Sequence, residues 1–310
     1  MPENVIFGTG PLGLAVAQRL VSSGKGVRLV NRSGTAQGPP GAEVFAADAT
    51  DPAAVHRACQ GARAVFHCAT GSYGQWEKVL PPIMNGIIEG AATASARIVY
   101  GDNLYAYGPV DGPLREDLPY KPLGPNTRVR AEVATTLMNA HASGKVRATI
   151  GRASDFYGPL ARQSKAGDGI FARAIAGKPA QVVGDPDVPH TVTFIDDFAA
   201  ALVTLSQQDR ALGGIWHVPS AETVTTRRFV EMVCDQLHQP PTLRPVPVIL
   251  INLLALASLP MRAVKETMYQ SERPWVVDHS KYERAFGAQP TPHESAIEAT
   301  IAWFRASVPR

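Results

Sequence analysis

The chain has 310 residues, of which 45% are hydrophobic and 18% are charged, and its formal net charge is +3. This composition supplies enough apolar material for a sizeable core and, without any run of Lys or Arg, argues against nucleic acid or a membrane surface as a partner. Eight histidines without paired spacing argue against a metal site, and three scattered cysteines argue against a disulfide framework and fit a reducing, cytoplasmic compartment (Cys59, Cys68, Cys234).

The first predicted strand, residues 5–7, runs into a glycine-rich segment, and a helix is predicted from residue 11 to 21. The segment is Gly8, Thr9, Gly10, Pro11, Leu12, Gly13. A G-x-G-x-x-G pattern between a strand and a helix is typical of Rossmann folds. Its first glycine permits the tight turn, the second lets the backbone approach the pyrophosphate, and the third allows close packing of helix on strand. We therefore expect these six residues to bind a dinucleotide.

The second predicted strand, residues 27–30, ends at Asn31, Arg32 and Ser33. NAD-binding folds usually place an Asp or Glu near this point to hold the ribose 2′-hydroxyl. No acid stands here, and an arginine can pair with a 2′-phosphate in a bidentate way. The cofactor expected from these residues is NADP rather than NAD.

Strand and helix patterns continue to alternate after this point. Further strands are expected at 44–45, 64–66, 97–100 and 146–150, and further helices from Pro52, over 79–95 and over 130–142. The connections are too long for hairpins, so the strands should form a parallel sheet with helices on both faces. The expected fold class is α/β, with a Rossmann-type doubly wound parallel sheet and a smaller C-terminal substrate-binding cap.

The alternation loosens in the second half of the chain. We assign residues 1–158 to the dinucleotide-binding domain, to which 190–215 return, and 159–189 with 216–290 to the cap. Residues 291–310 should form a C-terminal helix that opens with a capping box at Thr291 and Glu294. The most apolar stretch, 246–259, is too short to span a bilayer and predicts a buried helix.

Five further segments follow the glycine loop in a fixed order: AADAT at 46–50, FHCA at 66–69, LYAYGP at 104–109, GRASDFYGP at 151–159 and TFIDD at 193–197. In this order they resemble motifs of the extended short-chain dehydrogenase/reductase family, which includes sugar-nucleotide epimerases and dehydratases. The resemblance implies that an acidic residue contacts the adenine and that a strand end and a loop line the cofactor. The residues implied in cofactor binding are Asp48, Ala49, Cys68, Ala69, Thr70, Ala153 and Ser154.

The proton relay typical of that family does not carry over. It pairs a Tyr with a Lys four residues later and adds a Ser or Thr at the end of the fifth strand. None of the eight tyrosines here is followed by Lys at that spacing. Arg130 is the best match to the Lys, which places Asn126 at the Tyr, and a shifted register would use Arg128 and Gly124. The chain therefore resembles an atypical member of the family.

Asn103, at the Ser position, Tyr107 and Asp102 are the catalytic candidates. The Asn103 amide can polarise a carbonyl, whereas Tyr107, Asp102 or a water would supply the proton. Arg130 can bind ribose or phosphate, but a guanidinium cannot act as a base. Further candidates are Tyr105, His67, which should face the cofactor cleft from a strand end, and His190.

The function expected from the sequence is that of an NAD(P)-dependent oxidoreductase of the epimerase/dehydratase type, acting on a carbonyl or alcohol of a small molecule with a non-standard proton relay. The alternative is a non-catalytic NADP-binding redox sensor or regulatory protein, which the missing Tyr–Lys pair would suit. A small-molecule substrate is the expected partner, and assembly as a homodimer is left open. No signal peptide is expected, because the N-terminus lacks a basic region followed by a long apolar one.

Overall fold

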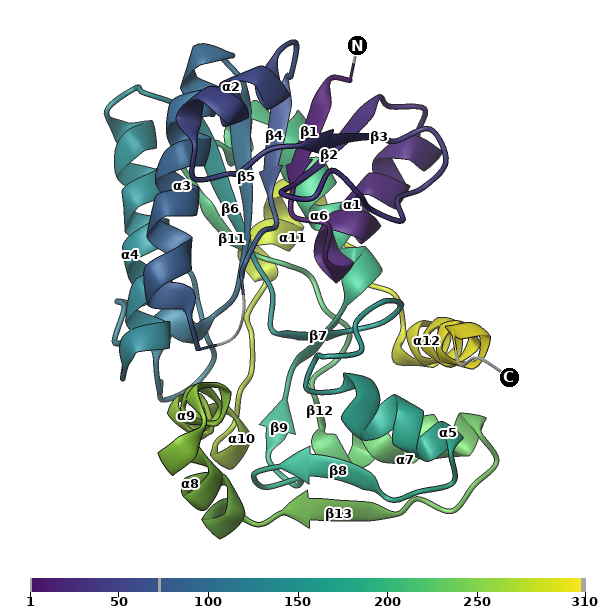
Figure 1. The fold of residues 1–310 in the computed structure, drawn as a ribbon. Coiled ribbons are helices and arrows are strands. Elements are labelled where there is room, and N and C mark those ends of the chain that lie inside the picture. The colour runs from purple at the N-terminus through teal and green to yellow at the C-terminus, as the bar shows by residue number, and fades with distance from the viewer. Residues whose placement is uncertain (1, 72–73, 308–310) are drawn as a thin grey trace.

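The computed structural model describes residues 2–71 and 74–307 (Figure 1). Its centre is a seven-stranded sheet in the order β11-β6-β5-β4-β1-β2-β3. Every neighbouring pair in this sheet is parallel. The strands are β1 (Asn4–Phe7), β2 (Val27–Asn31), β3 (Glu43–Ala46), β4 (Ala64–His67), β5 (Arg97–Asp102), β6 (Arg147–Arg152) and β11 (Ile215–His217). The predicted α/β class and its six strands are confirmed, and β11 adds a seventh that is too short to show a pattern of its own.

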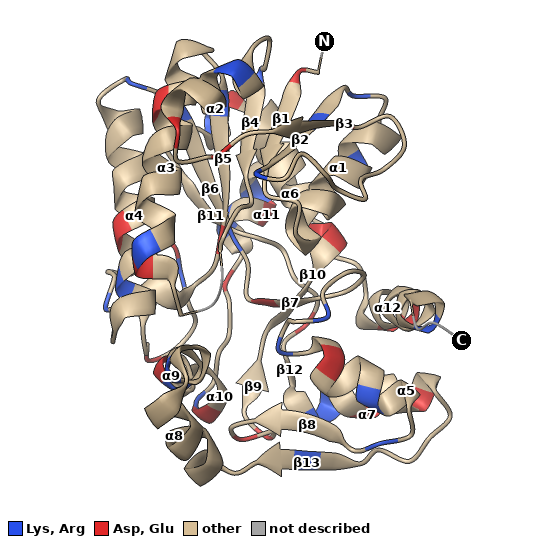
Figure 2. Cartoon of the chain, in the orientation of Figure 1, with Lys and Arg blue, Asp and Glu red and all other residues tan. Residues whose placement is uncertain are grey.

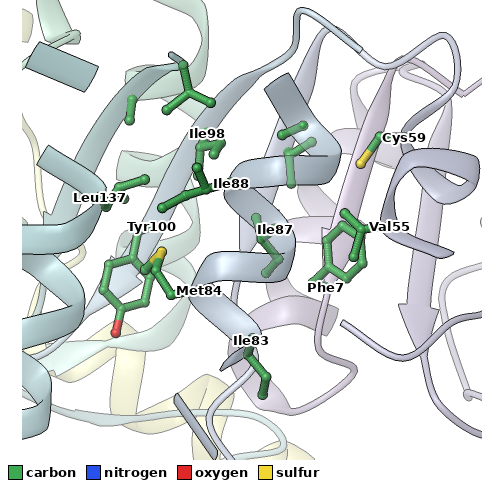
Figure 3. Close-up of a cluster of buried hydrophobic side chains, with 14 of the residues drawn as sticks. Phe7, Val55, Cys59, Ile83, Met84, Ile87, Ile88, Ile98, Tyr100 and Leu137 are labelled. Carbon is green, nitrogen blue, oxygen red and sulfur yellow. The ribbon is translucent and has the colours of Figure 1, made fainter. Parts of the chain in front are cut away.

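Helices cover both faces of the sheet, as a parallel sheet requires. One face carries α2 (Pro52–Cys59), α3 (Trp76–Thr93) and α4 (Pro125–Ala142), and the other carries α1 (Pro11–Ser22) and α6 (Ile195–Gln207). Figure 3 shows the core on the first face, where Val55 and Cys59 lie near Phe7, and Met84 lies near Tyr100. Burial raises the pKa of the Cys59 thiol to about 12.

Helix α4 begins five residues before the predicted start at residue 130. The Glu266 carboxylate accepts from the backbone N–H groups of Asn126 (3.2 Å) and Thr127 (2.7 Å). A carboxylate at a helix N-terminus satisfies orphan donors and favours the helix dipole. Because this cap comes from a residue more than a hundred positions away, no local pattern could indicate it.

The smaller lobe is built from short paired strands and helices below the sheet (Figure 1). Its strand pairs are β7 (Asp155–Tyr157) with β10 (Val192–Phe194), β9 (Pro189–His190) with β12 (Val224–Thr225), and β8 (Ala180–Val183) with β13 (Leu243–Val246). Helices of this lobe are η2 (Gly167–Ala172), α5 (Arg173–Ile175), α7 (Thr226–Gln236), α8 (Val248–Ala257), α9 (Leu259–Glu266), α10 (Tyr269–Glu272) and α12 (His293–Ser307). By contrast, α11 (Ser280–Phe286) packs against β11 of the sheet. Short 3₁₀ turns are η1 (Tyr105–Tyr107) and η3 (Asp209–Ala211).

Two local predictions fail. The apolar stretch 246–259 does form a helix, α8, but most of its side chains are exposed rather than buried. At the last helix, Thr291 donates its hydroxyl to Asp197 Oδ1 (2.7 Å) and its N–H to Oδ2 (2.9 Å). The reciprocal bonds of a capping box with Glu294 are not among the hydrogen bonds of the described residues. Across residues 2–71 and 74–307, no helix is both long enough and apolar enough to cross a bilayer.

Candidate functional site

The glycine loop lies at the carboxyl end of β1, between β4 and β2, where the strand order reverses. Gly8 has φ +103°, and a Cβ there would stand 2.7 Å from Ala69 N. A Cβ on Gly13 would stand 1.9 Å from Gly8 O. The fold itself therefore requires both outer glycines. By contrast, Gly10 has open space around the position of a Cβ and forms the N-cap of α1 in an extended conformation.

The loop after β2 is tied to the glycine loop by Asn31. Its Nδ2 donates to Thr9 Oγ1 (3.0 Å) and to Thr35 O (2.7 Å), and its Oδ1 accepts from Gly34 N (2.8 Å). Ser33 Oγ also donates to this Oδ1 (3.1 Å). Arg32 is exposed, and among the described residues no hydrogen bond or ion pair holds its guanidinium. The ends of β1 and β2 thus form one organised edge with an exposed cation, whose charge also helps to lower the pKa of Asp48.

The other predicted cofactor residues lie along the same edge. Asp48 accepts from Thr50 N (2.9 Å) and Thr50 Oγ1 (2.8 Å), and these bonds hold the pKa of Asp48 below its usual range. Cys68 donates its backbone N–H to Phe7 O (2.8 Å), and burial raises the pKa of its thiol to about 12. Around them lie the half-buried Ala49 and Ala69, the exposed Thr70, and the buried Ala153 and Ser154.

Ser154 stands out within this group. It lies two residues beyond the end of β6, and its Oγ is buried without a hydrogen-bond partner among the described residues. Buried hydroxyl groups are nearly always paired in native proteins. An orphaned hydroxyl at a strand end that faces the glycine loop's edge of the sheet fits a ligand with hydrogen-bonding groups, such as the ribose and amide of a nicotinamide cofactor.

A buried ionic cluster fills the carboxyl ends of β5 and β6. Asp102 Oδ2 accepts from Arg152 Nε (3.0 Å), and Oδ1 accepts from Arg130 NH1 (3.4 Å). Arg130 NH1 also donates to Tyr100 OH (2.9 Å), and its guanidinium lies 4.1 Å from the ring centre of Trp76. The side chain of Arg130 is only 3% exposed. In this arrangement the Asp102 carboxyl group contacts two arginines, and Arg130 lies beneath Trp76 rather than open to a ribose.

Tyr107 belongs to the same interior. Its hydroxyl lies 3.0 Å from His217 Nε2, while His217 Nδ1 lies 3.1 Å from Asp278 O. A backbone carbonyl only accepts, so Nδ1 carries the proton and the Tyr107 hydroxyl donates to Nε2. Burial raises the pKa of Tyr107 to about 12 and lowers that of His217 to about 3. The hydroxyl proton of Tyr107 is therefore committed to a neutral, buried histidine.

Asn103 differs from these two candidates because it keeps a half-buried position. Its Oδ1 accepts from Tyr105 N (3.1 Å), a contact that fixes the side chain at the end of β5. The carboxamide nitrogen keeps two donors that no described hydrogen bond uses. Of the three predicted catalytic residues, Asn103 is the one whose side chain is not enclosed by the protein.

A profile of the NAD dependent epimerase/dehydratase family matches residues 5–218. The chain belongs to this family. The expected resemblance is thereby confirmed, and so is the expectation of an enzyme of the epimerase/dehydratase type. A search of curated protein sequences gives no significant match.

Solved structures of similar fold span nearly the whole chain. A double mutant of DesIV, the dTDP-glucose 4,6-dehydratase of Streptomyces venezuelae, is 18% identical, with a TM-score of 0.80 over 98% of this chain and 97% of its own. The UDP-glucose 4-epimerase of Thermus thermophilus in complex with NAD is 21% identical, with a TM-score of 0.77 over 98% of this chain and 100% of its own. The UDP-glucuronic acid 4-epimerase of Bacillus cereus is 18% identical, with a TM-score of 0.78 over 98% and 99%.

The structure of this family member also brings together residues that the sequence reading did not connect. His190 Nε2 lies 3.0 Å from Asp155 Oδ2, its Nδ1 lies 3.0 Å from Gln270 O, and Lys165 Nζ lies 3.3 Å from Asp155 Oδ2. Although burial opposes ionisation of Asp155, Lys165 and His190 hold its pKa far below the usual range. The three side chains line a cavity with Thr225, Thr226 and Phe229. Asp155 directly follows Ser154, and this adjacency was the one available signal.

Two other expectations gain little from the structure. His67 is 1% exposed, and burial, with Arg130 adding to it, lowers the pKa of His67 to about 3, so it is neutral near pH 7. Its ring packs on that of Tyr100 at 4.7 Å rather than opening to the cleft. Within the described part of the chain, no three His, Cys, Asp or Glu side chains are grouped to hold a metal ion.

Proposed function

We propose that this family member is an NADP-dependent oxidoreductase of the epimerase/dehydratase type that acts on a carbonyl or alcohol of a small molecule. The observation that carries the proposal is the open space over Gly10, together with the exposed Arg32 at the end of the next strand. In a Rossmann fold this is where the backbone meets the pyrophosphate, and the end of the second strand is where the 2′ position is recognised. The orphaned Ser154 hydroxyl supports a ligand at the same edge.

The preference for NADP rests on charge. The Thermus epimerase, of similar fold, was solved with NAD. In the present chain the segment Asn31, Arg32, Ser33 carries no acid to repel a 2′-phosphate, and Asn31 holds the loop so that Arg32 stands in solvent. A free guanidinium offers a charge-assisted, bidentate contact to a phosphate group.

For the chemistry, we assign polarisation of the substrate oxygen to the Asn103 amide. Bound NADPH would supply the hydride, and the oxygen of the reduced carbonyl must then receive one proton. Asp102 and Tyr107 are better suited to positioning, because Asp102 is paired with two arginines and Tyr107 donates to His217. Because both side chains are engaged in these contacts, we infer that another group in the cleft supplies the proton.

His190 is the stronger proton source. Both of its ring nitrogens face acceptors, Gln270 O and the Asp155 carboxylate, so a doubly protonated His190 ring can donate to both. Burial lowers the pKa of His190, which makes the second proton easier to release. The pair lines a cavity, and Asp155 is the residue next to Ser154 in the sequence. A substrate in this cavity would lie beside the cofactor.

The test is a screen of small carbonyl compounds and alcohols, monitored by the absorbance of NADPH. With a substrate in hand, Asn103→Ala is expected to lower kcat about 10²–10³-fold, the usual cost of removing one donor to a developing oxyanion. His190→Asn is expected to lower it by about 10²–10⁴-fold, the usual share of a general acid. The matched control is His238→Asn, because His238 is exposed and its φ of +54° is one that Asn tolerates.

Two results would contradict the proposal. If tightly bound NADPH is consumed with none of the compounds, a redox sensor explains the protein better than an enzyme. If a substrate is found and neither Asn103→Ala nor His190→Asn alters turnover, the reacting atoms lie elsewhere.

A further inference from the structure

Helix α8 exposes an unusual amount of apolar surface. Six of its side chains form what we term the α8 apolar face, each between 45% and 73% exposed: Val248, Ile249, Leu250, Leu253, Leu254 and Leu256. Only Ile251 and Ala255 of this helix are buried. The helix carries no charged residue and lies at the periphery of the smaller lobe, away from the sheet (Figures 1 and 2). Contiguous apolar patches of this kind mark interaction sites.

The distribution of these side chains around the helix restricts what covers them. At about 100° per residue, five of the six side chains, from Leu256 round to Leu254, cover an arc of about 160°, and Val248 in the first turn lies outside it. A rigid partner surface covers one stripe of a helix, whereas a fluid apolar medium surrounds a protruding helix. Ten residues are too few to cross a bilayer, so such a helix would lie within the interface.

Basic residues border the α8 apolar face. Arg244 precedes the helix, Lys265 lies on α9, Arg273 follows α10, and all three are exposed. Arg262 donates from Nε to Ala255 O (2.8 Å) and from NH2 to Leu256 O (2.8 Å), so its guanidinium lies at the carboxyl end of α8. Two acids lie in the same segment: Glu266 is bound to the start of α4, and Glu272 on α10 is exposed. The exposed charge around the helix is therefore predominantly positive.

We propose that the α8 apolar face inserts into the interfacial region of an anionic lipid bilayer, with the bordering arginines and Lys265 at the headgroups. Apolar burial and attraction to anionic lipid are the two contributions that hold interfacial helices. A second copy of the chain fits less well, because a two-fold contact through α8 would bring the same basic residues of both copies together. An anionic surface neutralises those charges.

The experiment is flotation of the full chain with phosphatidylcholine vesicles, with and without phosphatidylglycerol. Binding is expected only where phosphatidylglycerol is present, and it should weaken with added salt. Leu253→Glu is expected to weaken binding about tenfold or more, because one large apolar side chain is no longer buried. Arg244→Gln and Arg273→Gln should each weaken it about fivefold, the usual contribution of one basic residue near such a surface.

The matched control is Leu123→Glu, since Leu123 and Leu253 are both 60% exposed and Leu123 lies outside α8 and α9. That variant should bind vesicles like the parent protein. Absence of binding to vesicles of either composition would overturn the proposal, and so would an equal loss with Leu123→Glu. Light scattering without lipid gives a third arm: a dimer that Leu253→Glu dissociates would assign the face to a second copy instead.

Discussion

The carboxyl edge of the sheet differs between the ends of β1 and β2 and the ends of β5 and β6. After β1 the backbone is accessible, with free space over Gly10, and after β2 the Arg32 side chain is exposed. At β5 and β6 the corresponding space is closed by Asp102, Arg130 and Arg152, all buried. The ends of β1 and β2 offer an open backbone and an exposed cation, whereas the ends of β5 and β6 are filled by an internal ionic cluster.

The largest expected effect tests the ionic cluster at the ends of β5 and β6. Asp102→Asn removes the only carboxylate that, among the described residues, pairs with the two buried arginines, and breaking a buried pair in this way costs about 3–5 kcal/mol of the free energy of unfolding. Urea unfolding followed by circular dichroism would measure it. The control is Asp117→Asn, which breaks the exposed pair with Arg115 and should leave the unfolding midpoint unchanged. Equal, small losses in the two variants would show that the cluster is not a structural unit.

The glycine loop after β1 is tested by comparing substitutions at two of its glycines. Gly10→Val should fold normally, because nothing lies within 4 Å of the added Cβ. It should lower NADP affinity about a hundredfold or more, since the side chain fills the space where backbone and pyrophosphate meet. Gly13→Val should instead lower stability by about 3 kcal/mol, because its Cβ meets Gly8 O. Calorimetric titration and thermal unfolding separate the two outcomes, and unchanged affinity in Gly10→Val would remove the loop from the site.

A somewhat smaller effect is expected from Arg32→Ala. Loss of a charge-assisted contact should weaken NADP binding by about 1.5–3 kcal/mol and leave NAD binding nearly unchanged. Titration of both cofactors into both proteins is the measurement. Arg19→Ala is a suitable control, because Arg19 is also an exposed arginine but lies near the far end of α1. Equal losses for NAD and NADP would reject the 2′-phosphate role.

The smallest expected effect is that of Tyr107→Phe. It removes one hydrogen bond to His217, which should cost about 1 kcal/mol of stability. With a working substrate, turnover should fall less than about tenfold, whereas loss of a general acid costs about 10²–10⁴-fold. A loss in that higher range, with NADP affinity intact, would return Tyr107 to the active site and contradict its positioning role.

The sequence predicted the sheet and its glycine loop because both depend on local patterns: short apolar runs, a glycine spacing and a helix start at Pro11. It could not predict the cap that Glu266 places on α4, or the way Tyr107 is bound to His217, since both join residues more than a hundred positions apart. The expectation of a buried helix at 246–259 failed for a different reason. Apolar composition indicates that a helix avoids water, but it does not indicate which surface covers it.

The buried cysteines have a practical consequence. Thiols react with alkylating reagents as thiolates, and burial raises the pKa of both Cys59 and Cys68 to about 12 and also raises that of Cys234. All three should react slowly with maleimides near neutral pH. A single cysteine introduced by Ile249→Cys would then be a fast-reacting handle in an otherwise native sequence. A polarity-sensitive dye attached there would report directly on what surrounds α8, without any prior removal of native thiols.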